Sequence, residues 1–347
     1  MAHMPGSAAP YIMNGTTYSE IIGEHESIVQ LRALVSKVAR SRAGIVLIYG
    51  ETGTGKGLVA RSLHAQSSRA RNNFTEINCA AIPGALLESE LFGHERGAFT
   101  GAVQRKEGLL EIARGGTVFL DEIRELDPVM QAKILTLLDT RRFRRIGSVQ
   151  ELSTDALFIA ATNKILLGEV QAGRFRDDLY YRLQVVSINI PPLRERGDDV
   201  FVLAERLLQK FNAVHGSRFT ELEPDVKDVF MRYQWPGNVR ELSNLLERIC
   251  ILEEGRRISL HHLPARILRE AAGTAVSATV NPPAVAASPQ NNPGADYATL
   301  TARYQQALIE QAMLTHDGNL SRAAAALGLS RHALRHQMLR LGLLKRS

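Results

Sequence analysis

The sequence predicts an α/β domain with a mainly parallel sheet, then a helical subdomain and a small helical domain at the end. Short apolar runs at 45–49, 117–120 and 157–161 have the length of buried strands. Amphipathic helical patterns lie between these runs, and this alternation is typical of a parallel sheet. After Pro192 the pattern becomes mostly helical.

Composition sets the domain boundaries that we expect. The first segment, 1–18, reads as a tag-like or disordered leader, and we exclude it from the fold. Residues 271–296 are rich in Ala, Pro, Ser and Asn and predict a flexible linker. These segments leave an α/β subdomain at 19–192, a helical subdomain at 193–270, with helical patterns at 200–215, 224–233 and 239–253, and a terminal domain at 297–347.

Global composition restricts the class of protein. The chain has 347 residues and 45% hydrophobic content, which is enough for more than one core. It has no run of about 18 apolar residues, so we expect no membrane span. Its two cysteines, Cys79 and Cys250, lack ligand spacing and suit a reducing compartment, so we expect a cytoplasmic protein.

A phosphate-binding loop directly follows the first apolar run. It reads Gly50-Glu51-Thr52-Gly53-Thr54-Gly55-Lys56 and leads through Gly57 and Leu58 into a helical pattern. Glycines let the backbone turn its N–H groups toward an anion, and the helix N-terminus adds positive partial charge. Lys56 can then reach the β- and γ-phosphates of ATP. Gly57 stands where a Ser or Thr hydroxyl often helps to hold Mg²⁺, so the metal must depend on other oxygens.

Two acidic residues end the second apolar run. Asp121 can hold Mg²⁺ through water, and Glu122 can polarise the water that attacks the γ-phosphate. Asn163 follows the third run and can contact that water or the γ-phosphate, although Asn also commonly ends strands as a turn former. Together these residues predict an ATPase that uses ATP and Mg²⁺.

The terminal domain carries most of the net charge and predicts a helix-turn-helix. Residues 297–347 contain seven basic and two acidic residues, which is +5 of the formal +6. In the expected second helix, Leu334, Met338 and Leu341 can face a core. The residues that we expect at double-stranded DNA are Arg322, Ser330, which caps that helix, Arg331, His332, Arg335, His336 and Arg340. A helical dimerisation hairpin is the alternative for this segment.

One loop carries a family resemblance. The residues Gly97-Ala98-Phe99-Thr100-Gly101-Ala102 match the GAFTGA loop of the sigma-54-dependent transcription activators, the NtrC-type enhancer-binding proteins. The resemblance runs from about residue 19 to 265 and resumes in the terminal domain, which is similar to the Fis type. It implies an AAA+ P-loop ATPase core with a helical lid, and a loop that contacts sigma-54 when ATP is bound. The alternative is a plain connection with a buried Phe99.

The resemblance also implies roles for single residues. Arg176 and Arg182 match arginine fingers that reach the γ-phosphate of the neighbouring subunit, unless they pair locally with Asp177 and Asp178. Arg240 matches the sensor II segment, with Asn238 as the helix cap. Asn78 matches a residue that pairs with the catalytic Glu122, while Ile22 and Gly23 match a segment near the adenine.

The same resemblance implies a homo-oligomer, a hexameric ring with dimeric DNA-binding domains, but here without the N-terminal regulatory domain that the family commonly carries. We therefore expect an ATP-hydrolysing activator that remodels sigma-54 RNA polymerase while bound to upstream DNA. Two alternatives stay open: an AAA+ DNA remodeller or initiator, and an ATP-binding, DNA-bound regulator with weak turnover. Gly57 and Arg124, which depart from the family pattern, prompt the second alternative.

Overall fold

The structure is a computed structural model that describes residues 12–13, 16–17 and 21–273, and ten residues of the C-terminal part. Those ten are 306, 309, 313, 319, 320, 323, 324, 334, 338 and 343. The chain forms two compact units, Met1–Val276 and Ser277–Ser347, and each is considered by itself. A short antiparallel pair, β1 (Ile12–Met13) and β2 (Thr16–Thr17), lies inside the expected leader.

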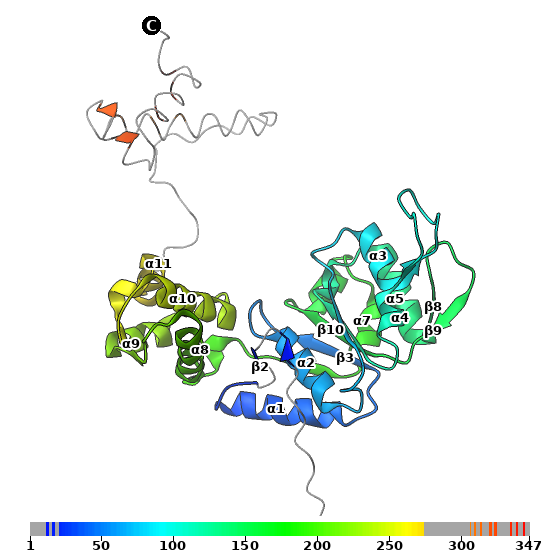
Figure 1. Ribbon diagram of the computed structural model, residues 1–347, viewed down its shortest axis with the longest axis horizontal. Helices are drawn as coiled ribbons and strands as arrows, with labels where there is room; N and C mark the ends of the chain where they lie inside the picture. The colour runs from blue at the N-terminus through cyan, green and yellow to red at the C-terminus, as the bar shows by residue number, and fades with distance from the viewer. Residues whose placement is uncertain are drawn as a thin grey trace, which may run out of the picture. The chain divides into compact units, whose positions relative to one another are not determined.

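A five-stranded parallel sheet forms the centre of the first unit (Figure 1). The strand order is β11-β3-β10-β7-β4. The strands are β3 (Ile45–Tyr49), β4 (Phe74–Asn78), β7 (Thr117–Asp121), β10 (Leu157–Thr162) and β11 (Ser187–Asn189). The three predicted strands are therefore confirmed as β3, β7 and β10. Because the strands are parallel, their carboxyl ends meet at one edge of the sheet.

Helices cover both faces of this sheet, and the strand residues alternate between two cores. Val46 and Ile48 pack toward α1 (Glu26–Ala39) and α2 (Lys56–Gln66). Ile45 and Leu47 belong to the opposite core. The helices on that side are α3 (Gly84–Phe92), α4 (Leu109–Ile112), α5 (Pro128–Thr140), α6 (Leu166–Gln171) and α7 (Asp177–Leu183).

Two small hairpins extend from the core. They are β5 (Gly93–His94) with β6 (Lys106–Glu107), and β8 (Arg142–Arg144) with β9 (Glu151–Ser153). Short 3-10 helices follow β7 and β11, η1 (Ile123–Glu125) and η2 (Leu193–Glu195).

A helical lid follows η2 and has its own core (Figure 1). It comprises α8 (Asp199–His215), α9 (Pro224–Arg232), α10 (Asn238–Leu252) and α11 (Ala265–Ala271), with β12 (Glu221–Leu222), β13 (Arg257–Ile258) and η3 (Leu260–His262). The three predicted helical stretches agree with α8, α9 and α10 to within one residue. Trp235 anchors this core: it is buried, donates to the Phe230 carbonyl at 2.9 Å and meets the rings of Phe230 and Tyr233 edge-on.

In the second unit, the described side chains form a small apolar cluster. Its buried members are Ile309, Ala323, Ala324, Leu334 and Met338. Leu334 and Met338 are four residues apart and both buried, as their helical spacing predicts. Among the described residues, no helix has both the length and the apolar character needed to cross a membrane.

Candidate functional site

The carboxyl edge of the sheet gathers the residues of the expected nucleotide site. Lys56, the first residue of α2, lies 3.0 Å from the Gly50 carbonyl and 3.4 Å from Glu122 Oε1. Both charged side chains are largely buried, Lys56 at 7% exposure and Glu122 at 16%. Opposite charges this close in a partly dry site interact strongly. An anionic ligand that entered the site would compete with Glu122 for Lys56.

The loop before Lys56 has the backbone of an anion cradle. Gly53 and Gly55 have φ of +80° and +102°, in the left-handed region that favours glycine. A Cβ on Gly53 would lie 2.1 Å from the Gly237 carbonyl, so the lid touches this loop directly. Thr54 closes the turn by donating to the Glu51 carbonyl at 2.8 Å. The loop therefore has little room for any side chain at position 53.

Gly57 lies in the first turn of α2, followed by Leu58. A Cβ at Gly57 would meet Phe119 at 3.8 Å, an ordinary contact. Packing therefore does not require glycine at this position.

The acidic pair and Asn163 lie beside the loop. Asn163 donates its backbone N–H to Glu122 Oε2 at 3.3 Å and its side-chain amide to Thr52 Oγ1 at 3.2 Å. Its Oδ1 is buried and has no hydrogen-bond partner among the described residues. An unpaired buried acceptor is costly, and a bound water would satisfy it.

The surroundings of Asp121 suit it to bind a cation. Burial and the neighbouring Glu122 raise the pKa of Asp121, while Lys56 and Arg240 oppose the rise. A divalent cation held with phosphate oxygens and water would relieve the repulsion between the two acids. This pair therefore fits Mg²⁺ bound together with a nucleotide.

Asn78 ends β4 beside Asp121, its partner in the sheet register. The expected pairing with Glu122 is not what the structure shows. Asn78 Oδ1 accepts the amide of Ala80 at 2.9 Å, and Glu122 is held by Lys56 and Asn163 instead.

A joint between the P-loop and the lid is a feature that the sequence did not predict. Arg194 forms a two-pronged pair with Glu51, with N–O distances of 2.6 and 2.8 Å. These hydrogen bonds are the largest cause that lowers the pKa of Glu51. The two residues are 143 positions apart, and no local pattern links them.

Asn238 completes this joint. Its side chain accepts the Leu193 amide at 2.8 Å and donates to the Thr52 carbonyl at 3.0 Å and to Glu51 Oε2 at 3.2 Å. The expectation that Asn238 caps α10 is wrong: Gly237 is the N-cap, and Asn238 is the first helical residue, with φ of +49°. Its side chain forms hydrogen bonds with residues of the P-loop and η2 rather than with the backbone of its own helix.

Arg240 follows in the same helix, and its backbone N–H donates to the Gly53 carbonyl at 3.3 Å. The segment that resembles sensor II is thus in direct contact with the phosphate-binding loop.

The Ile22–Gly23 segment also contacts the lid. Ile22 packs against the lid core, and Arg32 donates to the Gly23 carbonyl at 2.6 Å. The next two backbone amides, of Glu24 and His25, donate to Asp199 Oδ1 at the start of α8. This segment therefore contacts both the α/β core and the lid.

The two candidate arginine fingers lie on α7, and both have local partners. Arg176 pairs with Asp178, at 2.7 Å, as the local alternative anticipated. Arg182 instead meets Asp139 at 2.9 Å and the Leu138 carbonyl at 2.9 Å. Their side chains remain 46% and 39% exposed, although the Nε atom of Arg182 is buried.

Arg124 forms its ion pairs with acids other than Asp121 and Glu122. Its guanidinium lies 2.5 Å from Glu125 and 3.9 Å from Glu169. The charge that the sequence places after the acidic pair is thus neutralised by other residues.

The 97–102 loop presents an aromatic tip between two glycines. Gly97 and Gly101 have φ of +80° and +104° and open space around them, and the Gly97 amide donates to the Ala102 carbonyl at 2.8 Å. Phe99 is 41% exposed and touches the His94 ring edge-on, with 5.0 Å between centroids. Phe99 is therefore neither buried nor wholly free. Ala98 packs on Gly147 next to the β8–β9 hairpin, and Thr100 is exposed.

The residues predicted to contact DNA lie outside the described part of the chain. They are Arg322, Ser330, Arg331, His332, Arg335, His336 and Arg340.

Comparison with known proteins identifies the three parts of the chain. Residues 21–189 match the sigma-54 interaction domain, residues 194–279 the AAA+ ATPase lid domain, and residues 302–341 the Fis family of bacterial regulatory proteins.

Relatives match across nearly the whole chain. The transcriptional regulatory protein ZraR of Klebsiella oxytoca is 42% identical over 334 residues, covering 96% of this chain and 72% of that protein. Regulatory protein LuxO of Vibrio parahaemolyticus is 43% identical over 313 residues, covering 90% and 67%. The crystal structure of NtrX from Brucella abortus in complex with ATP has a TM-score of 0.67 at 31% identity, covering 93% of this chain and 69% of that one. The chain therefore belongs to the sigma-54-dependent transcriptional activators, with an AAA+ core and lid and a Fis-type helix-turn-helix.

Proposed function

We propose that this activator hydrolyses ATP between the subunits of a hexameric ring and uses the 97–102 loop to remodel sigma-54 RNA polymerase. The observation that carries the ATPase assignment is the convergence of Lys56, Glu122 and Asn163 at the carboxyl edge of the sheet. The observation that supports the polymerase contact is the exposed Phe99 on its glycine-flanked turn.

The residues of the site have complementary tasks. Lys56 exchanges its contact with Glu122 for the β- and γ-phosphates, and this exchange frees the carboxylate. Glu122 then accepts a hydrogen bond from the attacking water, while the unpaired Oδ1 of Asn163 accepts another. Asp121 would hold Mg²⁺ through water, and the ion would neutralise charge on the phosphates. Arg240 adds positive charge from the lid side.

The arginine fingers complete the site from a second subunit. Arg176 and Arg182 would leave exposed partners, Asp178 and Asp139, to contact the γ-phosphate of a neighbouring copy. Exposed ion pairs contribute only about 0–1 kcal/mol, so a doubly charged γ-phosphate competes well for these arginines. This requirement makes hydrolysis depend on assembly of the ring.

Open-complex formation on a sigma-54 promoter tests the proposal. With ATP, the wild-type chain should melt promoter DNA only when sigma-54 RNA polymerase is present. Phe99→Ala should keep phosphate release while losing promoter melting, and Lys56→Ala should lose both. Melting of DNA without polymerase would identify a DNA remodeller instead. Phosphate release no higher than that of Lys56→Ala, measured at high protein concentration, would identify a regulator with weak turnover.

The C-terminal unit would hold the ring at upstream double-stranded DNA. Its described apolar cluster supports a packed helical domain rather than a solvated tail. Glutamine substitutions at Arg331 and Arg335 should weaken DNA binding and leave phosphate release unchanged.

A further inference from the structure

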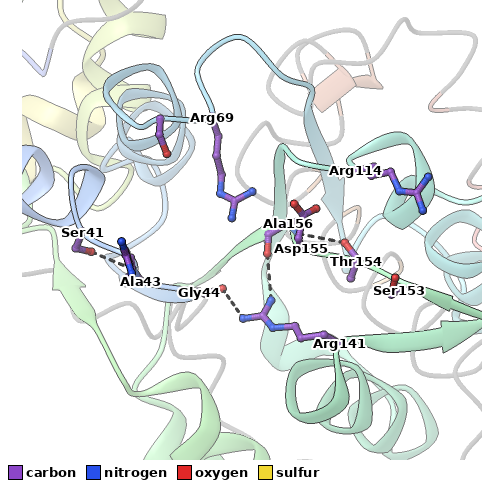
Figure 2. A pocket seen from close by; sticks show the side chains of 12 residues that line it. Ser41, Ala43, Gly44, Arg69, Arg114, Arg141, Ser153, Thr154, Asp155 and Ala156 are labelled. Carbon is purple, nitrogen blue, oxygen red and sulfur yellow. Dashed lines mark hydrogen bonds between the residues drawn. The ribbon is translucent and has the colours of Figure 1, made fainter.

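A basic pocket lies at the edge of the sheet opposite the nucleotide site, where β3, β7 and β10 begin (Figure 2). Its volume is about 850 Å³, within the range of small-molecule sites. Four arginines line it, Arg42, Arg69, Arg114 and Arg141, together with a single carboxylate, Asp155. With four positive charges and one negative charge, the lining has a net charge of +3.

Two of these arginines are fixed in place by neutral groups. Arg141 donates to the carbonyls of Gly44 and Ala156, each at 3.1 Å, and Arg69 donates to the Gly115 carbonyl at 2.9 Å. Figure 2 shows their guanidinium groups extending toward the middle of the pocket from opposite sides. Within the described part of the chain, neither has a carboxylate within 4.0 Å. Their charge is therefore not neutralised by the protein.

The positively charged arginines also repel one another. Burial lowers the pKa of Arg141, and the nearby charges of Arg182 and Arg69 lower it further. Asp155 offsets only one of the four positive charges, and its Oδ1 is held in place by the Gly115 amide at 2.8 Å. An anion in the pocket would relieve the repulsion.

Helix dipoles offer a simpler explanation for basic residues here. Helices α1, α2 and α5 end at this edge, and each carboxyl end carries about half a negative charge. Three such ends sum to about −1.5, which leaves roughly half of the net charge unbalanced. Moreover, the side chains of Arg69 and Arg141 donate to carbonyls next to strand starts, not to the last turns of those helices. Helix capping accounts for only part of the cluster.

We propose that this pocket binds a small anion with a diphosphate group, at a site separate from the ATP site. Guanidinium groups are strong donors to phosphate oxygens. Each has five N–H donors, of which Arg141 uses two and Arg69 one for these carbonyls, so the remaining donors of two arginines on opposite sides suit two linked phosphates. Ser41, Ser68 and Ser153 add hydroxyl groups to the lining. The diphosphate could be free pyrophosphate or part of a nucleoside diphosphate.

Calorimetric titration of the full chain carrying Lys56→Ala tests the proposal, because that substitution removes the lysine of the ATP site. Inorganic pyrophosphate should bind saturably at one site per chain. Arg42→Gln and Arg114→Gln should each weaken binding about fivefold, as expected for one unit charge a few ångströms from a phosphate in water. Asp155→Asn keeps an acceptor for the Gly115 amide and removes the only carboxylate, so it should tighten binding about fivefold.

The control is Arg232→Gln, an exposed arginine in the last turn of α9 that does not line this pocket. It should leave pyrophosphate binding unchanged. Equal affinity for ADP and pyrophosphate would identify the diphosphate as the recognised group, and tighter ADP binding would add contacts with the nucleoside. Absence of saturable binding, an equal loss in Arg232→Gln, or weaker binding in Asp155→Asn would overturn the site.

Discussion

Replacing Asn238 tests whether the P-loop and the lid are joined as described. The side chain is fully buried and makes two hydrogen bonds to backbone groups, with the Leu193 amide and the Thr52 carbonyl. In Asn238→Ala both groups lose their partner, which costs about 1 kcal/mol for each neutral hydrogen bond. Alanine at φ of +49° adds about 1 kcal/mol, because asparagine tolerates the left-handed region better. The expected loss is therefore about 3 kcal/mol before the further hydrogen bond to Glu51 Oε2 is counted, and that bond can only increase the loss.

The backbone contribution can be separated from the hydrogen bonds. Asn238→Gly loses the same bonds but adopts a positive φ without strain, so it should recover about 1 kcal/mol relative to alanine. Asn244 lies on the same helix and is exposed, so Asn244→Ala serves as the control and should change stability by less than about 0.5 kcal/mol.

Urea unfolding followed by tryptophan fluorescence measures these differences. Trp235 is the single tryptophan of the chain and lies in the lid core, three residues before Asn238. A loss smaller than about 0.5 kcal/mol in Asn238→Ala would refute the assigned hydrogen bonds. A glycine variant less stable than the alanine variant would refute the strain argument.

Three further predictions follow from single sites. Arg176→Ala and Arg182→Ala should each lower phosphate release at high protein concentration by about 10³-fold or more. Their unfolding free energies should fall by less than about 1 kcal/mol, because both ion pairs are exposed; a large loss of stability would contradict the finger role. Gly57→Ala should raise the unfolding free energy by about 0.5–1 kcal/mol, since the added Cβ has room beside Phe119; no gain in urea unfolding would show that the local backbone requires glycine. Burial lowers the pKa of His64 below its ordinary value of 6.5. When the pH is lowered, His64 is therefore protonated in the unfolded chain at a higher pH than in the folded chain. Stability should therefore fall as the pH drops through about 6.5, and His64→Asn should make that slope shallower; an unchanged slope would contradict the assignment.

The parts of the fold that could be predicted from sequence are those with a local signal. Strands β3 and β10 are continuous apolar runs because both faces of the sheet are covered. Strand β4 reads FTEIN and alternates buried with exposed residues, and β11 has only three residues. Neither gives a run long enough to stand out, so both were missed.

The residues of the candidate site also fall into those with a local sequence signal and those without one. The P-loop and the acidic pair are short motifs that can be recognised from residues adjacent in the sequence. The contacts of Glu51 with Arg194 and with Asn238 join positions 143 and 187 residues apart. Such contacts arise only when the lid packs against the core. The direction of Arg124, toward Glu125 and Glu169, likewise depends on tertiary packing.

The close approach of Gly53 to the Gly237 carbonyl has a consequence for protein engineering. Positions 50–56 and 191–240 touch through backbone as well as side chains, so they are constrained to change together. A chimera that combined the P-loop of one AAA+ protein with the lid of another would keep every phosphate-facing amide. It would still mismatch at this seam unless both segments were exchanged as one unit.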